Sequence, residues 1–204
     1  MLEEGVDSYM FNVGDKVVYP MHGAGTIDSI DKKNILDEEV EYINISMPGG
    51  VKVMVPSNQA SKQGLRNIIS QNEVDRVFGI LENDETEMSD NWNKRYRDNM
   101  DKMKSGDIYE VADVVRNLSF KQKEKGLSTG EKKMLNNAKQ ILVSELVLVE
   151  NASSTEMEKI VDNKIDVSYK ENRVSEGIGD EINTSNIVNK FIPFNAENTG
   201  TSQQ

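Results

Sequence analysis

Residues 40–55, with the sequence VEYINISMPGGVKVMV, decide the fold of the first part of the chain. Two runs rich in β-branched residues, Val40–Met47 and Val51–Val55, are separated by the turn signal Pro48-Gly49-Gly50, so we expect a β-hairpin. Side chains alternate along a strand. The second strand is therefore expected to place Val51, Val53 and Val55 on one face and Lys52 and Met54 on the other.

The residues before this hairpin predict two further strands. Lys16–Tyr19 ends at Pro20, and the glycines of His22-Gly23-Ala24-Gly25 indicate a turn before Thr26–Ile30. Pro56 closes the series. Short strands at close spacing, joined by tight turns, favour a small, strongly bent antiparallel barrel.

From about residue 71 the apolar residues follow a helical period. The first helix shows this in Val74, Val77, Phe78 and Leu81. Two further helices are expected over about 90–104 and about 107–125. The next begins at the capping box Ser128-Thr129-Gly130-Glu131 and carries apolar residues from Leu135 to Val149. The last is expected over 154 to about 165. The fold class is therefore α+β, an antiparallel β-barrel followed by an all-α helical domain.

Composition excludes several classes of site. The 204 residues contain no cysteine and one histidine, which excludes disulfides, thiolate metal sites and sites with several histidines. No apolar run approaches the ~20 residues of a membrane span. We therefore expect a cytoplasmic protein without a metal, a cofactor or a small-molecule substrate.

Signals of catalysis are weak, so we expect no enzyme. The sequence has no P-loop, dinucleotide fingerprint or nucleophile elbow. His22 could act as a general base, but no acidic partner stands nearby, and a structural or partner-contact role is favoured. The acidic residues 37–39 belong to an exposed run that would not separate their pKa values.

The charge is unevenly distributed. The net charge is -11, yet 13 of the 24 basic residues fall within residues 71–150. A local basic patch can therefore exist on an acidic protein, although charge alone favours a solvated helix face.

Trp92 is the only tryptophan, and it lies in the polar and basic sequence DNWNKRYR of residues 90–97. Tyr96 and Met100 follow at helical spacing, so one interpretation is that Trp92 begins a buried stripe. The other is an exposed aromatic wedge for a nucleic-acid groove, with neighbouring cations on the phosphates. The pattern leaves both open.

The sequence FNVGDKVVYPMHG of residues 11–23 resembles the opening of the CarD/CdnL family of bacterial transcription regulators. This module is also similar to the polymerase-interacting domain of the transcription-repair coupling factor. The second half resembles CarD too, in DNW at 90–92, VADVVRNL at 111–118 and the segment from Gly126 to Leu142. The coupling factor lacks this helical half.

The resemblance implies a Tudor-like barrel that binds the lobe and protrusion region of the RNA polymerase β subunit, and a helical domain that contacts promoter DNA. It implies that a tryptophan wedge at the upstream edge of the melted bubble stabilises the open complex. The implied DNA-contacting residues are Trp92, Lys94, Arg95, Arg97, Lys121 and Lys132. The implied polymerase-contacting residues are Lys33, Met54, which stands where relatives have arginine, and Lys52, which could substitute for it.

The resulting division of the chain has four parts. They are an N-terminal extension over 1–10, a polymerase-interacting domain over 11–70, a helical domain over 71–167 and a polar, disordered tail over 168–204. The alternative function is an adaptor on RNA polymerase or repair machinery that never contacts DNA, and that reading predicts a buried Trp92. The oligomeric state and the direction of regulation do not follow from the sequence.

Overall fold

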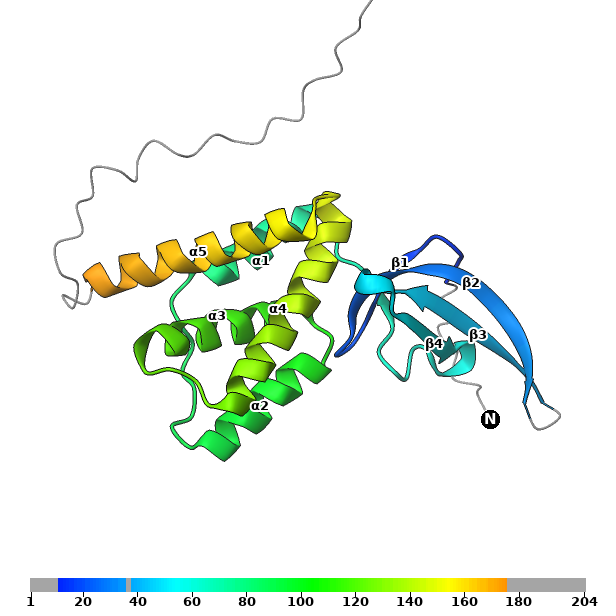
Figure 1. Ribbon diagram of the computed structural model, residues 1–204, viewed down its shortest axis with the longest axis horizontal. Helices are drawn as coiled ribbons and strands as arrows, with labels where there is room; N and C mark the ends of the chain where they lie inside the picture. The colour runs from blue at the N-terminus through cyan, green and yellow to red at the C-terminus, as the bar shows by residue number, and fades with distance from the viewer. Residues whose placement is uncertain (1–10, 36–37, 176–204) are drawn as a thin grey trace, which may run out of the picture.

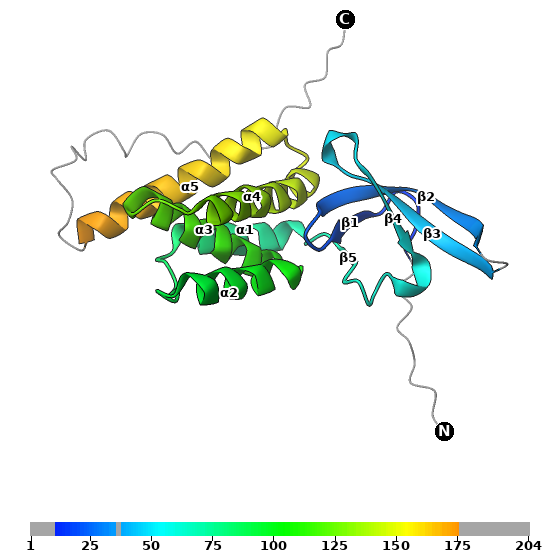
Figure 2. The same cartoon turned by 60° about the horizontal axis from the view of Figure 1, so that its bottom comes forward.

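The computed structural model describes residues 11–35 and 38–175, which form a β-sheet beside one end of a group of helices (Figures 1 and 2). The expected N-terminal extension lies outside these residues. So does the part of the predicted tail beyond residue 175.

The sheet has five antiparallel strands in the order β4-β3-β2-β1-β5. The strands are β1 Lys16–Tyr19, β2 Gly23–Ile35, β3 Glu38–Ser46, β4 Lys52–Pro56 and β5 Arg66–Asn67. The two edge strands, β4 and β5, do not pair in the described part of the chain, so the antiparallel sheet is confirmed while its closure into a barrel is not. β5 was not predicted from the sequence, because it has only two residues.

The expected hairpin is present. β3 pairs with β4, and a short 3-10 turn, Pro48–Gly50, joins them with positive φ angles at both glycines. In β4, Val55 is buried and Lys52 and Met54 are exposed, as the alternation predicted. The core beneath the sheet consists of Phe11, Val17, Ile27, Ile43, Ile45, Met47, Val55, Ala60 and Leu65.

Five helices follow in the described residues. They are α1 Gln71–Glu82, α2 Trp92–Lys104, α3 Ile108–Glu124, α4 Thr129–Glu150 and α5 Ser154–Ser175. Their N-termini are determined locally, because Asn91, Asp107 and Ser128 each accept a hydrogen bond from a backbone amide of the first turn. Both the predicted apolar faces and the Ser128–Glu131 capping box are confirmed. None of these helices is long and apolar enough to cross a membrane.

The predicted end of the last helix is wrong. α5 continues to Ser175, ten residues beyond the expected end, so residues 168–175 belong to the helical part and not to a tail. Ser168 is buried and donates a hydrogen bond to the carbonyl of Asn83, while Tyr169 packs edge-on against Phe120. These contacts with distant segments extend a helix whose own residues show weak periodicity.

The sheet contacts the helices mainly through β2 and α4. The amide of Ala24 donates to Ser144 Oγ at 2.8 Å, and Gly23 has φ +93° with no room for a side chain, since an added Cβ would lie 2.5 Å from the same oxygen. Arg66, in β5, donates to both carboxylate oxygens of Glu145 at 2.7 and 2.9 Å. Glu145 is only 1% exposed and also accepts from the amide of Ile69.

We expect Arg66→Ala to lower the free energy of unfolding by about 3 kcal/mol, because it leaves the buried Glu145 carboxylate without its partner. Lys16→Ala is the control, since the exposed Lys16 ammonium donates to the Leu148 carbonyl at the same contact and its loss should cost less than ~1 kcal/mol. Denaturant unfolding measures both values. Equal, small effects would show that the pair does not hold the sheet on α4.

Candidate nucleic-acid interface

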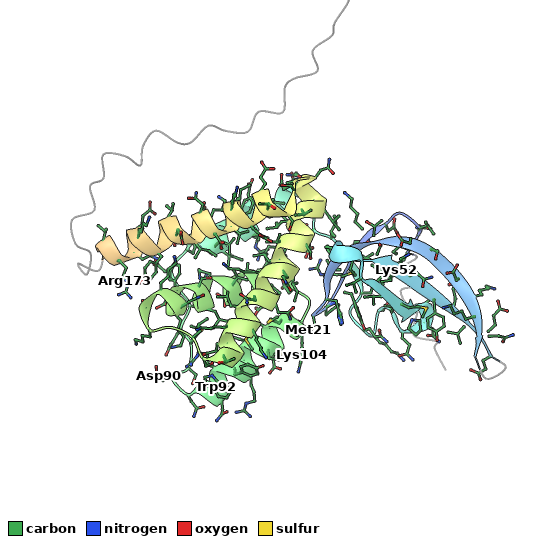
Figure 3. The ribbon with its side chains drawn as sticks, viewed as in Figure 1. Met21, Lys52, Asp90, Trp92, Lys104 and Arg173 are labelled. Carbon is green, nitrogen blue, oxygen red and sulfur yellow. The ribbon has the colours of Figure 1, made fainter. Side chains whose placement is uncertain are left out.

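Trp92 is the first residue of α2 and lies on the helical part, away from Lys52 on the sheet (Figure 3). Its side chain is 43% exposed, one of five large apolar side chains exposed in the described residues. The interpretation that Trp92 begins a buried stripe is therefore wrong. Tyr96 does pack against the helical core, and the indole stacks on its ring with centroids 5.4 Å apart.

The orientation of the indole is fixed from two sides. Trp92 Nε1 donates to Ser128 Oγ at 3.0 Å, and the first turn of α4 lies against the ring, since a Cβ added at Gly130 would be 3.6 Å from Trp92 Cζ2. The ring is thus both accessible and held in place, which suits an aromatic side chain that must enter a groove.

Glu131 connects this contact to the helix interior. Its carboxylate accepts from the hydroxyl and the amide of Ser128 at 2.8 and 3.1 Å, and from Arg95 Nε at 2.8 Å. Glu131 is 2% exposed. Burial would raise the pKa of Glu131, but the hydrogen bonds from Ser128 and the Arg95 guanidinium outweigh it and hold that pKa below its ordinary value.

Arg95 has a different role from the one that the resemblance implies. It is 7% exposed, pairs with Glu131 and donates to the carbonyls of Ser89 and Asp90 at 2.8 and 3.1 Å. A guanidinium used in this way is not available to a phosphate. We therefore remove Arg95 from the DNA-contacting set and regard it as a residue that positions the segment before Trp92.

The other basic residues of the set remain on the surface. Lys94, Arg97 and Lys132 are exposed, and Lys121 is half-buried beside a hollow of about 340 Å³ that residues 85–90 also line. Lys94 forms an ion pair with Asp98 at 3.1 Å. Because both of its side chains are well exposed, this pair is worth no more than ~1 kcal/mol and does not prevent Lys94 from contacting a phosphate.

The segment before α2 is held by a second polar cluster, which the sequence did not indicate. Thr86 Oγ1 donates to Asp113 at 2.9 Å, its amide donates to Asn117 Oδ1, and Arg116 donates to the Ile80 carbonyl. Asn117 and Arg116 are buried. The segment preceding Trp92 is thus fixed to α3, although its own sequence is polar and shows no period.

The three residues implied as polymerase contacts lie on the exposed side of the sheet. Lys33 Nζ donates to Met54 Sδ at 3.0 Å and lies 5.9 Å from the centre of the Tyr42 ring, so β2, β3 and β4 bring these side chains together. Lys52 forms an exposed ion pair with Asp28 at 3.3 Å.

His22 contacts Tyr19 and Pro20, and neither residue is an acid–base partner. Its ring stacks on Tyr19 with centroids 4.7 Å apart, and Nδ1 lies 3.0 Å from the Pro20 carbonyl oxygen. Within residues 11–35 and 38–175, no group of three or more histidine or acidic side chains could hold a metal ion.

Comparison with known proteins agrees with this arrangement. Residues 11–69 match the model of the CarD-like/TRCF RID domain, and residues 76–162 match the model of the CarD C-terminal domain. A protein of Bacillus subtilis (strain 168) named "Putative transcription factor YdeB" is 38% identical over 149 residues, 72% of this chain and 97% of the relative. The fold and these matches define a CarD-like transcription factor. The chain belongs to the CarD family.

Glu131→Gln should remove part of the acid sensitivity of the fold. The lowered pKa of Glu131 means that its ionised form stabilises the protein above pH ~4.5, and that this contribution is lost as the pH falls through the folded-state pKa. We expect the variant to be less stable at pH 7, by about 3 kcal/mol, and to lose less stability than the wild type on acidification.

Urea unfolding between pH 3 and pH 7, followed by the fluorescence of Trp92, measures this. Glu171→Gln, which changes an exposed carboxylate of α5, is the matched control. A Glu131→Gln curve parallel to that of the wild type would contradict the assignment.

Proposed function

We propose that this CarD-family protein binds the RNA polymerase β-subunit lobe through the exposed side of its sheet and stabilises the open promoter complex through Trp92. Trp92 enters the minor groove at the upstream edge of the bubble, and Lys94, Arg97, Lys121 and Lys132 contact phosphates. We also propose that the protein associates with the nucleoid through RNA polymerase. The observation that carries the proposal is the exposed indole held in one orientation.

Wedging between base steps requires an apolar side chain that need not reorganise before it enters the groove. The hydrogen bond to Ser128 and the stacking on Tyr96 supply this preorganisation. The N-terminus of α2 adds backbone amide donors beside the indole, which favour a nearby phosphate. Exposure of the ring also counts against the adaptor without DNA contact, which requires a buried Trp92.

DNA binding by the protein without polymerase is expected to be weak. The net charge of -11 opposes the few phosphate contacts, and the acidic residue Asp90 precedes Trp92 by two positions. Docking on polymerase raises the effective concentration of the indole at the promoter to the millimolar range. With the domain boundaries expected from the sequence, the polymerase contact belongs to residues 11–70 and the DNA contact to the domain that begins at residue 71.

The sheet offers a surface suited to such docking. Lys33, Lys52 and Met54 combine two cations with a polarisable apolar side chain, and Met54 is 48% exposed. Stabilisation of the open complex then follows from linkage, since a factor that prefers the melted promoter shifts the population by its difference in affinity.

We expect Trp92→Ala to shorten the lifetime of open complexes about tenfold, equivalent to ~1.4 kcal/mol, while polymerase binding stays unchanged. Trp92→Phe should have an intermediate effect because it keeps an aromatic wedge but loses the bond to Ser128. Competitor-challenged promoter complexes give the lifetimes. Unchanged lifetimes on several promoters would remove Trp92 from the mechanism.

Charge reversal at Lys33 or Lys52 should weaken polymerase association several-fold and leave the helices folded. Lys170→Glu, an equal charge change at an exposed position of α5, should not. Binding to purified polymerase, with circular dichroism to check folding, tests both. Undiminished association in Lys33→Glu and Lys52→Glu would place the docking surface elsewhere.

A further inference from the structure

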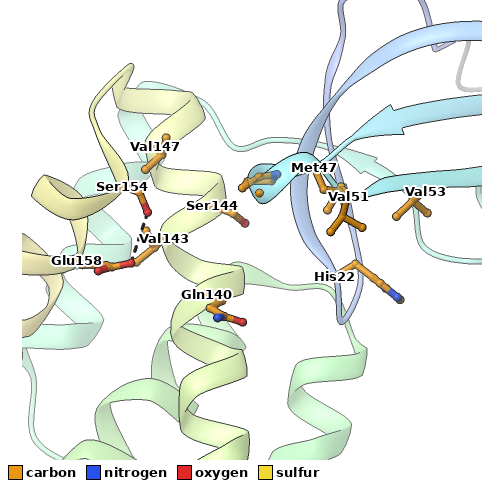
Figure 4. Close-up of a pocket in the computed structure, with 12 residues that line it drawn as sticks. His22, Met47, Val51, Val53, Gln140, Val143, Ser144, Val147, Ser154 and Glu158 are labelled. Atoms are coloured by element: carbon orange, nitrogen blue, oxygen red, sulfur yellow. Dashed lines mark hydrogen bonds between the residues drawn. The ribbon is translucent and has the colours of Figure 1, made fainter.

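A groove of about 440 Å³ lies between the sheet and the helices and takes no part in either proposed contact (Figure 4). Val51 and Val53 line it from the sheet, and Val143 and Val147 line it from α4. Glu158 of α5 also lines it, and its carboxylate accepts a hydrogen bond from Ser154. This slot therefore combines apolar side chains from both walls with one carboxylate and with the polar side chains of His22, Gln140, Ser144 and Ser154.

Because Val51 is exposed, part of the apolar surface of this slot remains accessible to solvent. Among the described residues, the large exposed apolar side chains are Val13, Val51, Met54, Trp92 and Val174. Met54 and Trp92 belong to the surfaces already assigned. Val51 is 58% exposed and faces a groove in which other apolar side chains are already gathered.

We propose that the segment Lys190–Phe194 of the same chain, with the sequence KFIPF, occupies this groove. The stretch after residue 175 is mostly Asn, Ser, Thr, Glu and Gly, and this segment holds both of its aromatic residues and its only proline. Two phenylalanines and an isoleucine match a slot lined by valines, and their burial would remove Val51 from water.

The length of the connecting chain fits the distance to be crossed. Glu158 lies 17 residues before the end of α5, so at ~1.5 Å per residue the groove is about 25 Å from Ser175. Phe191 lies sixteen positions after Ser175. The root-mean-square span of a random coil of that length is ~22 Å, and the effective concentration of a tethered ligand is highest when the linker span matches the distance.

The charge of Lys190 favours one orientation of the docked segment in the groove. Lys190 is the only basic residue after Arg173, and it directly precedes Phe191. We expect its ammonium to pair with Glu158, the acidic side chain among the lining residues of the groove. Opposite charges at the edge of an apolar contact fix register more than they add affinity.

Occupation of the groove would connect the sheet to α4 and α5 through a third element. It would add to the Arg66–Glu145 and Ala24–Ser144 contacts, which also join the sheet to α4. The segment thereby limits movement of the sheet relative to the helices. This inference does not depend on polymerase or DNA binding.

Cysteine cross-linking in the full chain tests the proposal, because the natural sequence has no cysteine. One variant carries Val51→Cys and Asn195→Cys. The control carries Val13→Cys and Asn195→Cys, since Val13 is as exposed as Val51 but does not line the groove. Under the same mild oxidant, the first pair should form an intramolecular disulfide at least tenfold faster than the second.

Two further substitutions separate docking from simple tethering. Phe191→Ala with Phe194→Ala, added to the Val51/Asn195 cysteine pair, should reduce the rate to that of the Val13 control. Lys190→Glu should slow the reaction, and Glu158→Lys added to it should restore the rate. Equal rates at Val51 and Val13, or disulfides that form only between two chains, would overturn the proposal; the latter result would assign the groove to a second copy.

Discussion

The buried carboxylate of Glu131 is the constraint on which the presentation of Trp92 depends. One side chain accepts from the start of α4, through Ser128, and from α2, through Arg95, while the guanidinium of Arg95 also binds the carbonyls that precede Trp92. Such a carboxylate is costly to bury unless every partner is present. Once they are present, an exposed indole can be kept in one orientation without being covered, which is what a groove-entering side chain requires.

α4 carries a second buried carboxylate, Glu145, towards its other end. Glu145 lies 14 residues after Glu131, about 21 Å along α4, and accepts from Arg66 and Ile69 near the sheet. α4 thus connects the two surfaces that we propose for DNA and polymerase, and a rigid helix keeps their separation constant. Two contacts that are each weak can then act together, because docking at one end fixes the position of the other.

Basic side chains illustrate why charge patterns alone do not define a binding surface. Lys94, Arg95 and Arg97 are neighbours in sequence, yet successive positions of a helix point about 100° apart, so Arg95 faces the interior while the other two face solvent. A guanidinium that satisfies two carbonyls and a buried carboxylate serves the fold. The surface is therefore smaller than the sequence suggests, and its effect rests more on the indole than on charge.

The sequence by itself determined the local elements. These are the hairpin at Pro48-Gly49-Gly50, the alternating faces of β4 and the starts of α2, α3 and α4. They follow from turn chemistry, side-chain period and capping, which act between residues a few positions apart. The resemblance to CarD, confirmed by the family matches, likewise lay in contiguous motifs. Tertiary structure alone decided that Trp92 is exposed, that Arg95 is buried, that β5 joins the sheet and that α5 reaches Ser175. Each of these depends on a partner far along the chain (Ser128, Glu131, β1 and Phe120), and no local period or propensity records which distant side chain a residue will contact.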